Sequence, residues 1–335
     1  MRLFLLVAAL TGGAAAFRAD DCRAHGGTWT CDYMEVHNKT YRSAGEFRRR
    51  AKVLEHAQER VDMLTDTTAH RRRLEGVNFA LGPYADRYTH ETHHNVHLDD
   101  DRHKERHRRQ LRLASGASPA TVDWRLEGFE SPVRVQGDCG GCFAFAATTV
   151  LEYWDTKWRR GAPRSISAQA AMDCTSGPGG LNDGCEGGLM EDVFEYAELH
   201  HLPYTEEDPY TGEESTCRAG SVPDLVGSYG VITGDEDPRA EDHIAWLVAN
   251  YGPVAVGIDS RSDAFQNYAG GIFRASMCDN DIDHAVAIVG YAPGYWIVKN
   301  SWGSTWGEDG YMRLERGTNA CGISEYITYV RTVHE

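Results

Sequence analysis

The segment Gln136-Gly-Asp-Cys139-Gly-Gly-Cys142-Phe-Ala-Phe145 decides the fold. From Cys142 to about Arg160 the chain contains neither Gly nor Pro, and it then reaches Gly161, which predicts a helix that begins at the cysteine. The N-terminal end of a helix carries a partial positive charge, which favours the thiolate over the thiol. Because the thiolate is the nucleophilic form of cysteine, the segment predicts a reactive Cys142.

Two polar residues further along the chain fit the other parts of a nucleophilic site. His284 precedes the strand-like run 285–289, and Asn300 follows the run 295–298; they lie 142 and 158 positions after Cys142. A cysteine, a histidine and an asparagine act as nucleophile, base and orienting group when the fold brings them together. Taken alone, His284 is more often a core histidine.

The pair Cys139-Gly-Gly-Cys142 has two other interpretations, a thioredoxin-like redox pair and half of a zinc site. The sequence contains no second C-x-x-C pair, and no histidine follows at zinc-finger spacing. We therefore favour the nucleophile over both alternatives.

The composition is that of a globular protein with an acidic balance. The chain has 335 residues, 41% hydrophobic and 25% charged, which excludes low-complexity, collagen-like and coiled-coil chains. Its net charge of −16 argues against a nucleic-acid-binding protein. Residues 1–117 carry 20 Lys and Arg against 16 Asp and Glu, a net +4, whereas residues 118–335 carry 14 against 34, a net −20. We expect the two parts to attract each other, and a solvated acidic surface without a partner is the alternative.

The N-terminal third divides into three parts. Residues 1–16 predict a secretory signal peptide, with a positive Arg2, a short apolar core and three alanines at 14–16 as the cleavage site. Residues 45–65 carry apolar side chains at helical spacing. Residues 90–112 are rich in His and Arg, and we interpret them as an exposed linker whose charge rises as the pH falls. Metal binding by these histidines is the alternative.

The region after Pro119 begins helix-rich and ends strand-rich. The runs 254–258, 285–289, 295–298 and 310–314 have β-like composition. This order predicts an α+β fold with two lobes, and a cleft between lobes is a common binding site.

Several separate blocks, in the same order along the chain, resemble the papain/cathepsin L family of cysteine peptidases. Residues 35–91 resemble the inhibitory propeptide of that family, because Glu46, Arg50, Leu54 and Val61 fall on the spacing of its helical motif and Tyr84-Ala-Asp86 on the segment after it. The blocks that match the peptidase domain are 122–125, 136–146, 184–188, 252–256, 283–286 and 296–303.

The resemblance implies a papain-like two-lobed α+β fold, with a helical left lobe and an antiparallel, β-barrel-like right lobe, preceded by a helical propeptide domain. It divides the chain into a signal peptide at 1–16, an inhibitory propeptide at 17–117 and a peptidase domain at 118–335. The propeptide includes the His/Arg-rich linker at about 90–117.

The resemblance also assigns catalytic roles. Cys142 is the expected nucleophile, and His284 the general base and acid. Asn300 orients the imidazole, and Trp302 screens that hydrogen bond from water. Gln136 donates its side-chain amide to the tetrahedral oxyanion, together with the backbone N–H of Cys142.

A few positions depart from the family pattern. Phe143 stands where the family usually has Trp, and Gly141 where it has Ser, so we expect altered packing with an intact mechanism. In the propeptide, Ala57, Thr65 and Gly82 stand where the family favours Asn, so we expect inhibition to depart from the family more than activity does.

The nine cysteines are an odd number, and the resemblance accounts for each of them. It implies the pairs Cys139–Cys185, Cys174–Cys217 and Cys278–Cys321. Cys22 and Cys31 remain, close enough to pair in the propeptide, and Cys142 is left as a free thiol.

The resemblance implies a pocket for the second substrate residue before the scissile bond, with an apolar wall that suits Leu, Val or Phe. Tyr326 lies at its floor, where the ring shortens the pocket and the hydroxyl could admit a polar group. Glycines let the substrate backbone approach closely. The other implied substrate-binding residues are Gly187, Gly188, Leu189, Met190, Gly257, Ile282, Asp283 and Trp302.

We therefore expect a papain-like cysteine endopeptidase, made as a preproenzyme, that acts through a thioester acyl-enzyme and is activated at acidic pH. It should need no metal or organic cofactor. Its expected partners are peptide and protein substrates and its own propeptide as intramolecular inhibitor. We expect neither nucleic-acid binding nor a membrane span, and we expect a monomer.

The expected location is the secretory pathway, ending in the lysosome or outside the cell, where Asn38-Lys-Thr40 is a glycosylation sequon. Two alternative functions remain open, a catalytically silent papain-fold binding or storage protein and an exopeptidase. His200-His201 could suggest a cathepsin B-like occluding loop, but no insertion surrounds them, so we favour a solvated helix end.

Overall fold

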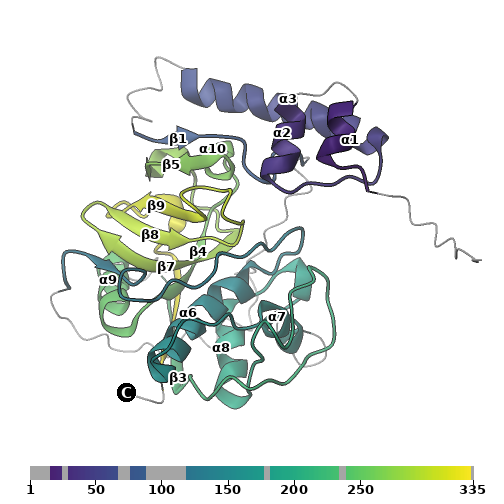
Figure 1. Ribbon diagram of the computed structural model, residues 1–335. Helices are drawn as coiled ribbons and strands as arrows, with labels where there is room; N and C mark the ends of the chain where they lie inside the picture. Colours follow the sequence, from purple (N-terminus) through teal and green to yellow (C-terminus); the bar gives the residue numbers. More distant parts are fainter. Residues whose placement is uncertain are drawn as a thin grey trace, which may run out of the picture.

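The computed structural model of the chain describes residues 16–24, 29–66, 76–87, 118–176, 182–233 and 239–332 (Figure 1). We call residues 16–87 the N-terminal segment and residues 118–332 the main body. The predicted histidine-rich linker and, apart from Ala16, the predicted signal peptide lie outside the described residues.

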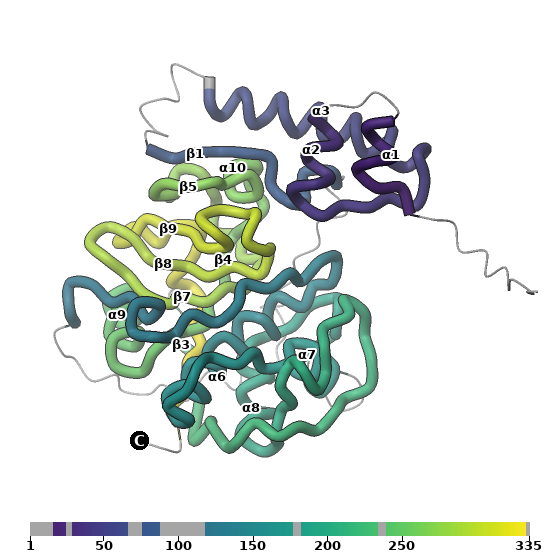
Figure 2. The backbone as a smooth tube through the Cα atoms, in the orientation of Figure 1, coloured from purple at the N-terminus to yellow at the C-terminus, as the bar shows by residue number. Residues whose placement is uncertain are grey.

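The described residues of the N-terminal segment form three helices, α1 (Ala19–Ala24), α2 (Trp29–Val36) and α3 (Ala44–Asp66). They lie together at one end of the molecule (Figure 2). In α3 the side chains of Leu54, Ala57 and Val61 are buried at the spacing of one helical face, which is the periodicity visible in the sequence. A disulfide between Cys22 and Cys31 joins α1 to α2.

The helical lobe of the main body is built around α6 (Cys142–Arg159), with α7 (Ala168–Thr175) and α8 (Met190–Leu199) on one side and the sheet on the other. The first turns of α6 contain mostly small residues, so neighbouring elements can pack closely on both sides of it. The helix ends where Arg160 takes a left-handed conformation (φ 52°), followed by Gly161.

The second lobe is a sheet of eight strands, and α9 (Ala240–Tyr251) packs against it. The path of paired strands is β3 (Ser228–Thr233), β10 (Tyr326–Arg331), β4 (Val254–Ile258), β7 (His284–Ala292), β8 (Tyr295–Lys299), β9 (Tyr311–Glu315) and β6 (Ile272–Phe273), and β2 (Val122–Asp123) pairs with β7.

The expectation of an antiparallel, barrel-like lobe needs a correction. Among the described strands, β3 and β6 are the two ends of the path and do not pair with each other, so the sheet is not a closed barrel. The pairing of β6 with β9 is parallel, whereas the other pairs of the sheet are antiparallel. The two-lobed α+β architecture itself is confirmed.

The N-terminal segment joins the main body as an added strand. β1 (Asn78–Phe79) pairs antiparallel with β5 (Tyr268–Gly270), which follows α10 (Asp263–Gln266). Further along, the backbone N–H of Ala80 donates to the carbonyl of Asn267 at 2.9 Å. Short 3-10 helices occur at Gly184–Glu186, Ala275–Met277 and Ala320–Gly322.

The main body contains three disulfides, Cys139–Cys185, Cys174–Cys217 and Cys278–Cys321. With Cys22–Cys31 they are the four pairs expected above, and Cys142 is the unpaired cysteine. Within the described residues, no helix combines the length and apolar character needed to cross a membrane.

Candidate active site

Cys142 is the first residue of α6 and lies beside the start of β7. Its side chain is fully buried, and burial raises the pKa of the thiol to about 12. The backbone N–H of Ala285 opposes this effect, whereas the charge of Asp283 adds to it. The predicted helix start is therefore present, and burial favours the neutral thiol at this position.

His284 begins β7, and its imidazole lies between Asn300 and Trp302. The ring nitrogen Nε2 is 2.8 Å from Oδ1 of Asn300, and the ring stacks on Trp302 with centroids 5.0 Å apart and planes at 30°. His284 is fully buried, and burial lowers its pKa to about 4 although the Asn300 hydrogen bond acts in the other direction.

Burial acts against the expected ionised sulfur in this form of the molecule. The helix N-terminus and nearby N–H groups favour the thiolate, but the loss of solvent around both groups outweighs them. Burial thus shifts the pKa of each group toward its neutral form, the thiol and the uncharged imidazole.

Asn300 and Gln136 are held by a junction of two chain segments. The backbone N–H of Gln136 donates to the carbonyl of Ser301 at 2.8 Å, and Gly303 donates to the carbonyl of Arg134 at 3.0 Å. The Ser301 hydroxyl donates to Gln136 Oε1 at 2.6 Å. The junction therefore fixes Gln136 next to the segment that carries Asn300.

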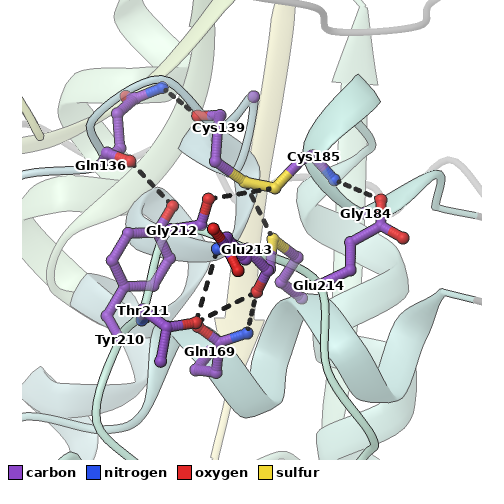
Figure 3. Close-up of a disulfide and its surroundings, with 12 residues drawn as sticks. Gln136, Cys139, Gln169, Gly184, Cys185, Tyr210, Thr211, Gly212, Glu213 and Glu214 are labelled. Atoms are coloured by element: carbon purple, nitrogen blue, oxygen red, sulfur yellow. Dashed lines mark hydrogen bonds between the residues drawn. A yellow bond between two sulfur atoms is a disulfide. The ribbon is translucent and has the colours of Figure 1, made fainter. Parts of the chain in front are cut away.

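The loop between Gln136 and Cys142 is tied to the helical lobe as well. Gln136 Nε2 donates to the carbonyl of Cys139 at 3.1 Å, and Cys139 is bonded to Cys185 (Figure 3). The backbone N–H of Gly140 donates to the carbonyl of Cys185 at 2.7 Å, and a side chain at 140 would have its Cβ 2.5 Å from that oxygen. Glycine is therefore required at this position.

The N-terminal segment covers this part of the molecule. Tyr84 is buried and packs edge to face on Trp302, with ring centroids 5.5 Å apart. The guanidinium of Arg87 lies 4.2 Å from the centre of the Tyr84 ring and pairs with Asp138 in the loop before Cys142. The segment thus contacts both the tryptophan beside His284 and the loop that leads to the cysteine.

A buried polar cluster holds the segment in this conformation. Asp86 accepts hydrogen bonds from Tyr33 (3.1 Å), Tyr41 (2.8 Å) and the Lys39 ammonium (3.0 Å). Burial acts to raise the pKa of Asp86, but the charge of Lys39 and these hydrogen bonds hold it below its usual value. Arg50 of α3 also donates to the Asp86 carbonyl at 3.3 Å.

His37 links α2 to the main body. Its Nδ1 lies 2.9 Å from the hydroxyl of Thr305. Burial, followed by the charge of Lys39, lowers the pKa of His37 to about 4, while the Leu81 carbonyl and Asp86 act in the opposite direction.

The residues expected to form the substrate pocket come together in part. A Cβ on Gly257 would lie 2.8 Å from Ile282 and 3.3 Å from Tyr326, so these three are in contact. The Tyr326 hydroxyl, however, donates to the carboxylate of Glu191, which follows Met190. The hydroxyl expected to admit a polar group is therefore already engaged with the protein.

The glycines and Asp283 of the predicted pocket also have defined environments. A Cβ on Gly188 would lie 2.3 Å from the side chain of Asn182, which accepts a hydrogen bond from Leu189 N–H at 2.7 Å. Asp283 accepts from the backbone N–H of Ser260 at 2.7 Å, and burial raises its pKa to about 7.

The sequence did not indicate that three further residues form hydrogen bonds with the expected site residues: Ser301, Tyr210 and Glu191. Ser301 stands inside a motif that was recognised for its neighbours. The hydrogen bond from Tyr210 to Gln136 spans 74 positions, and that from Tyr326 to Glu191 spans 135. Local sequence patterns carry no signal for contacts of this length.

Comparison with known proteins places this geometry in context. Residues 118–331 match the family model described as papain family cysteine protease. The senescence-specific cysteine protease SAG12 of Arabidopsis thaliana is 34% identical over 314 residues, covering 89% of this chain and 88% of the relative. Cathepsin L of Sarcophaga peregrina is 32% identical over 315 residues, covering 89% of this chain and 90% of the relative.

Solved structures give the same result. The digestive procathepsin L 3 of the Tenebrio molitor larval midgut superposes with a TM-score of 0.76 at 31% identity, covering 90% of this chain and 97% of that chain. Digestive procathepsin L2 from the same source superposes with a TM-score of 0.75 at 30% identity, covering 89% and 97%. Both matches extend over the N-terminal segment as well as the main body.

Proposed function

Because the chain belongs to the papain family of cysteine proteases, we propose that Cys142, His284 and Asn300 are its catalytic residues. The observation that carries this proposal is the convergence of three distant segments. The free thiol at the start of α6 lies beside β7, whose first residue is hydrogen-bonded to Asn300 and stacked on Trp302.

In the proposed reaction His284 first takes the thiol proton of Cys142. The thiolate attacks the peptide carbonyl carbon, and His284 returns the proton to the amine as the C–N bond breaks, which leaves a thioester. Water then attacks the thioester, giving its proton to His284, and the thiolate leaves the carboxylic acid product. Asn300 orients the ring without adding charge. Gln136 and the Cys142 backbone N–H stabilise the oxyanion in both steps.

We propose further that residues 17–117, which include nearly all of the N-terminal segment, are an inhibitory propeptide, and that residues 118–335 are the peptidase. The procathepsin L structures support an intramolecular inhibitor of this kind. The contacts of Tyr84 and Arg87 with the site support it in this chain. While the segment is bound, burial of Cys142 and His284 disfavours the ionised pair and so disfavours the reactive thiolate.

Activation at acidic pH follows from His37 in this proposal. Its pKa is about 4 in the bound segment and about 6.5 in water, so the released segment binds more protons between these values. The contribution of a neutral His37 to docking is complete above pH 6.5 and is lost as the pH falls toward 4. Activation at constant ionic strength should therefore be faster at pH 4.5 than at pH 7.5.

The proposed specificity is a preference for Leu or Val at the second residue before the scissile bond. Tyr326 presents its ring to the pocket, since its hydroxyl is engaged with Glu191. The ring shortens the pocket, so a substrate Phe side chain should fit less well than Leu or Val. The hydroxyl is engaged with Glu191 and therefore offers no hydrogen bond to a polar substrate side chain. A matched set of peptides that differ in this one residue tests the preference.

We propose entry into the secretory pathway, with a signal peptide at 1–16 and a destination in the lysosome or outside the cell. Four disulfides are consistent with an oxidising compartment. Asn38 of the sequon is exposed at the turn after α2, where a glycan has room, so we propose that it is glycosylated.

Hydrolysis of a peptide blocked at both ends tests the proposed endopeptidase. The activated protein should cleave it, and Cys142→Ser should remove the activity. Cleavage that requires a free terminus would indicate an exopeptidase. No cleavage of any peptide by a correctly processed chain would indicate a silent homologue and would refute the proposal.

A further inference from the structure

Tyr210 contacts Gln136 from a loop that the proposed mechanism does not use. Its hydroxyl donates a hydrogen bond of 2.9 Å to the backbone carbonyl of Gln136 (Figure 3). Gln136 is fully buried, so water does not have ready access to this carbonyl as a substitute donor. The hydrogen bond is therefore part of what fixes the backbone at the proposed oxyanion site.

Gln136 is anchored on both sides of its Cα atom. Ser301, which follows β8, accepts from the backbone N–H at 2.8 Å, and its hydroxyl donates to the side-chain oxygen at 2.6 Å. Tyr210, in the connection between α8 and β3, holds the carbonyl on the other side. One anchor comes from the sheet and the other from the helical lobe. The direction of the Gln136 side-chain amide depends on both.

The position of Tyr210 is itself fixed by its neighbours. Its ring packs edge to face on Phe145 in the first turns of α6, with centroids 4.7 Å apart. The next residue, Thr211, donates from its backbone N–H at 2.9 Å and its hydroxyl at 3.1 Å to Gln169 of α7. The Gln169 amide donates in turn to the carbonyl of Glu213 at 2.8 Å (Figure 3). The hydroxyl is thus presented by a braced loop.

Two further observations fit a role for this hydroxyl. Burial raises the pKa of Tyr210, so the group remains a hydrogen-bond donor at neutral and acidic pH. The hydroxyl also lies close to the residue before Cys142, since a Cβ on Gly141 would be in van der Waals contact with the Tyr210 oxygen at 3.4 Å.

We propose that Tyr210 is a positioning residue for the oxyanion site, and that its hydroxyl sets the orientation of Gln136 toward the tetrahedral intermediate. The inference rests on the proposed role of Gln136. It adds a residue that touches neither the substrate nor the thiol, and it assigns to the helical lobe a part in aligning a donor that the sheet also holds.

The test is Tyr210→Phe, which keeps the ring on Phe145 and removes the hydroxyl. The full-length chain is activated at acidic pH, and its active sites are titrated. Loss of an oxyanion donor lowers kcat by roughly 10²–10³-fold, and a misaligned donor should cost less, about tenfold. KM should stay within about twofold, and the limbs of the pH profile should not move, because neither Cys142 nor His284 is altered.

The matched control is Tyr204→Phe. Tyr204 lies in the same connection and donates from a buried hydroxyl to Asp155 at 2.8 Å, away from Gln136. This variant should keep its kcat even if it lowers the melting temperature. An equal loss of kcat in both variants would show a general effect on folding and would overturn the inference.

A double variant decides whether Tyr210 acts through Gln136. Gln136→Ala with Tyr210→Phe should have the same kcat as Gln136→Ala alone. Without the Gln136 side-chain amide, Tyr210 has no oxyanion donor left to align. A further tenfold loss in the double variant, or an unchanged kcat in Tyr210→Phe, would overturn the inference. A wild-type chain in which Cys142 cannot be titrated would refute the proposed function and the inference with it, and the titration separates this outcome from the others.

Discussion

Two buried clusters of ionisable groups in this molecule differ in charge. Cys142 and His284 are fully buried, and burial raises the pKa of the thiol to about 12 and lowers that of the imidazole to about 4. Asp86 is 4% exposed, yet the Lys39 charge and the hydrogen bonds around it hold its pKa below the usual value. Burial shifts the pKa of both groups in the first cluster toward their neutral forms, whereas ionic and hydrogen-bonded partners hold the second cluster charged.

The difference bears on the proposed inhibition, in which a stable N-terminal segment covers an inactive site. The charged cluster at Asp86 joins α2, α3 and the chain that leads to Tyr84. Tyr84 packs on Trp302, beside the neutral cluster. We propose that the electrostatic interactions that fix the N-terminal segment in this way help to keep solvent from Cys142 and His284.

The largest expected effect comes from removing the nucleophile. Cys142→Ser should lower kcat/KM of the activated protein by roughly 10⁴-fold or more, because a serine hydroxyl at this site is a far weaker nucleophile than the thiolate. The same variant should leave the stability of the N-terminal segment unchanged, because Cys142 takes no part in the Asp86 cluster. Peptide hydrolysis and hydrogen exchange of residues 29–66 measure the two outcomes. A stable segment with undiminished hydrolysis would contradict the assignment.

The next effect comes from neutralising the charged cluster. Asp86→Asn leaves the largely buried Lys39 ammonium without its counter-charge, and breaking a buried pair from one side costs about 3–5 kcal/mol. We expect the segment to open at least a hundredfold more often at pH 7, measured as the rate of activation. Asp62→Asn is the control, since Asp62 lies exposed on α3. Equal activation rates for the two variants would contradict the role of Asp86.

Removing the disulfide of the segment should have a smaller effect that does not depend on pH. Replacing both Cys22 and Cys31 by Ser removes the cross-link that closes a loop spanning nine positions, so the unfolded segment gains conformational entropy. The folded segment should lose about 2–3 kcal/mol of stability as a result. Activation should become faster by a similar factor at pH 5 and at pH 7. A change confined to acidic pH would mean that the disulfide acts through the titrating groups instead.

The smallest expected effect is a weaker dependence of the activation rate on pH. His37→Gln keeps a polar side chain opposite Thr305 and removes the titration, so the pH dependence of activation between about 6.5 and 4 should decrease by up to one proton. His56→Gln is the control, because His56 is exposed on α3. An unchanged pH dependence of activation in His37→Gln would show that groups other than His37 cause the response to acid.

Much of the fold was predictable because its signals are local. The helix predicted at 45–65 is α3, and the runs 254–258 and 295–298 lie in β4 and β8. Helices α7, α8 and α9 were not delimited from the sequence. The prediction of a barrel-like lobe is wrong in one respect, because the sheet does not close. Closure depends on whether the end strands β3 and β6 pair with each other, and no local sequence pattern indicates this.

The residues of the candidate site could be proposed from the sequence, but their protonation states could not. The motif around Cys142 indicated a thiolate, since the helix N-terminus is visible in the sequence. Burial of the thiol, which raises its pKa, depends on long-range packing, and contacts at the site such as Tyr84 with Trp302 join residues 218 positions apart. Tyr210, Glu191 and the partners of His37 were missed for the same reason.

The most direct test of the account is the labelling of Cys142 by an epoxide inactivator of cysteine proteases, followed by mass spectrometry at pH 7. We predict that the intact chain reacts slowly at this residue, and that the chain freed of its N-terminal segment takes up one equivalent rapidly. Equal rates in the two forms would contradict the proposal that the bound segment keeps Cys142 and His284 in their neutral forms. Absence of labelling in both would contradict the assignment of Cys142 as the nucleophile.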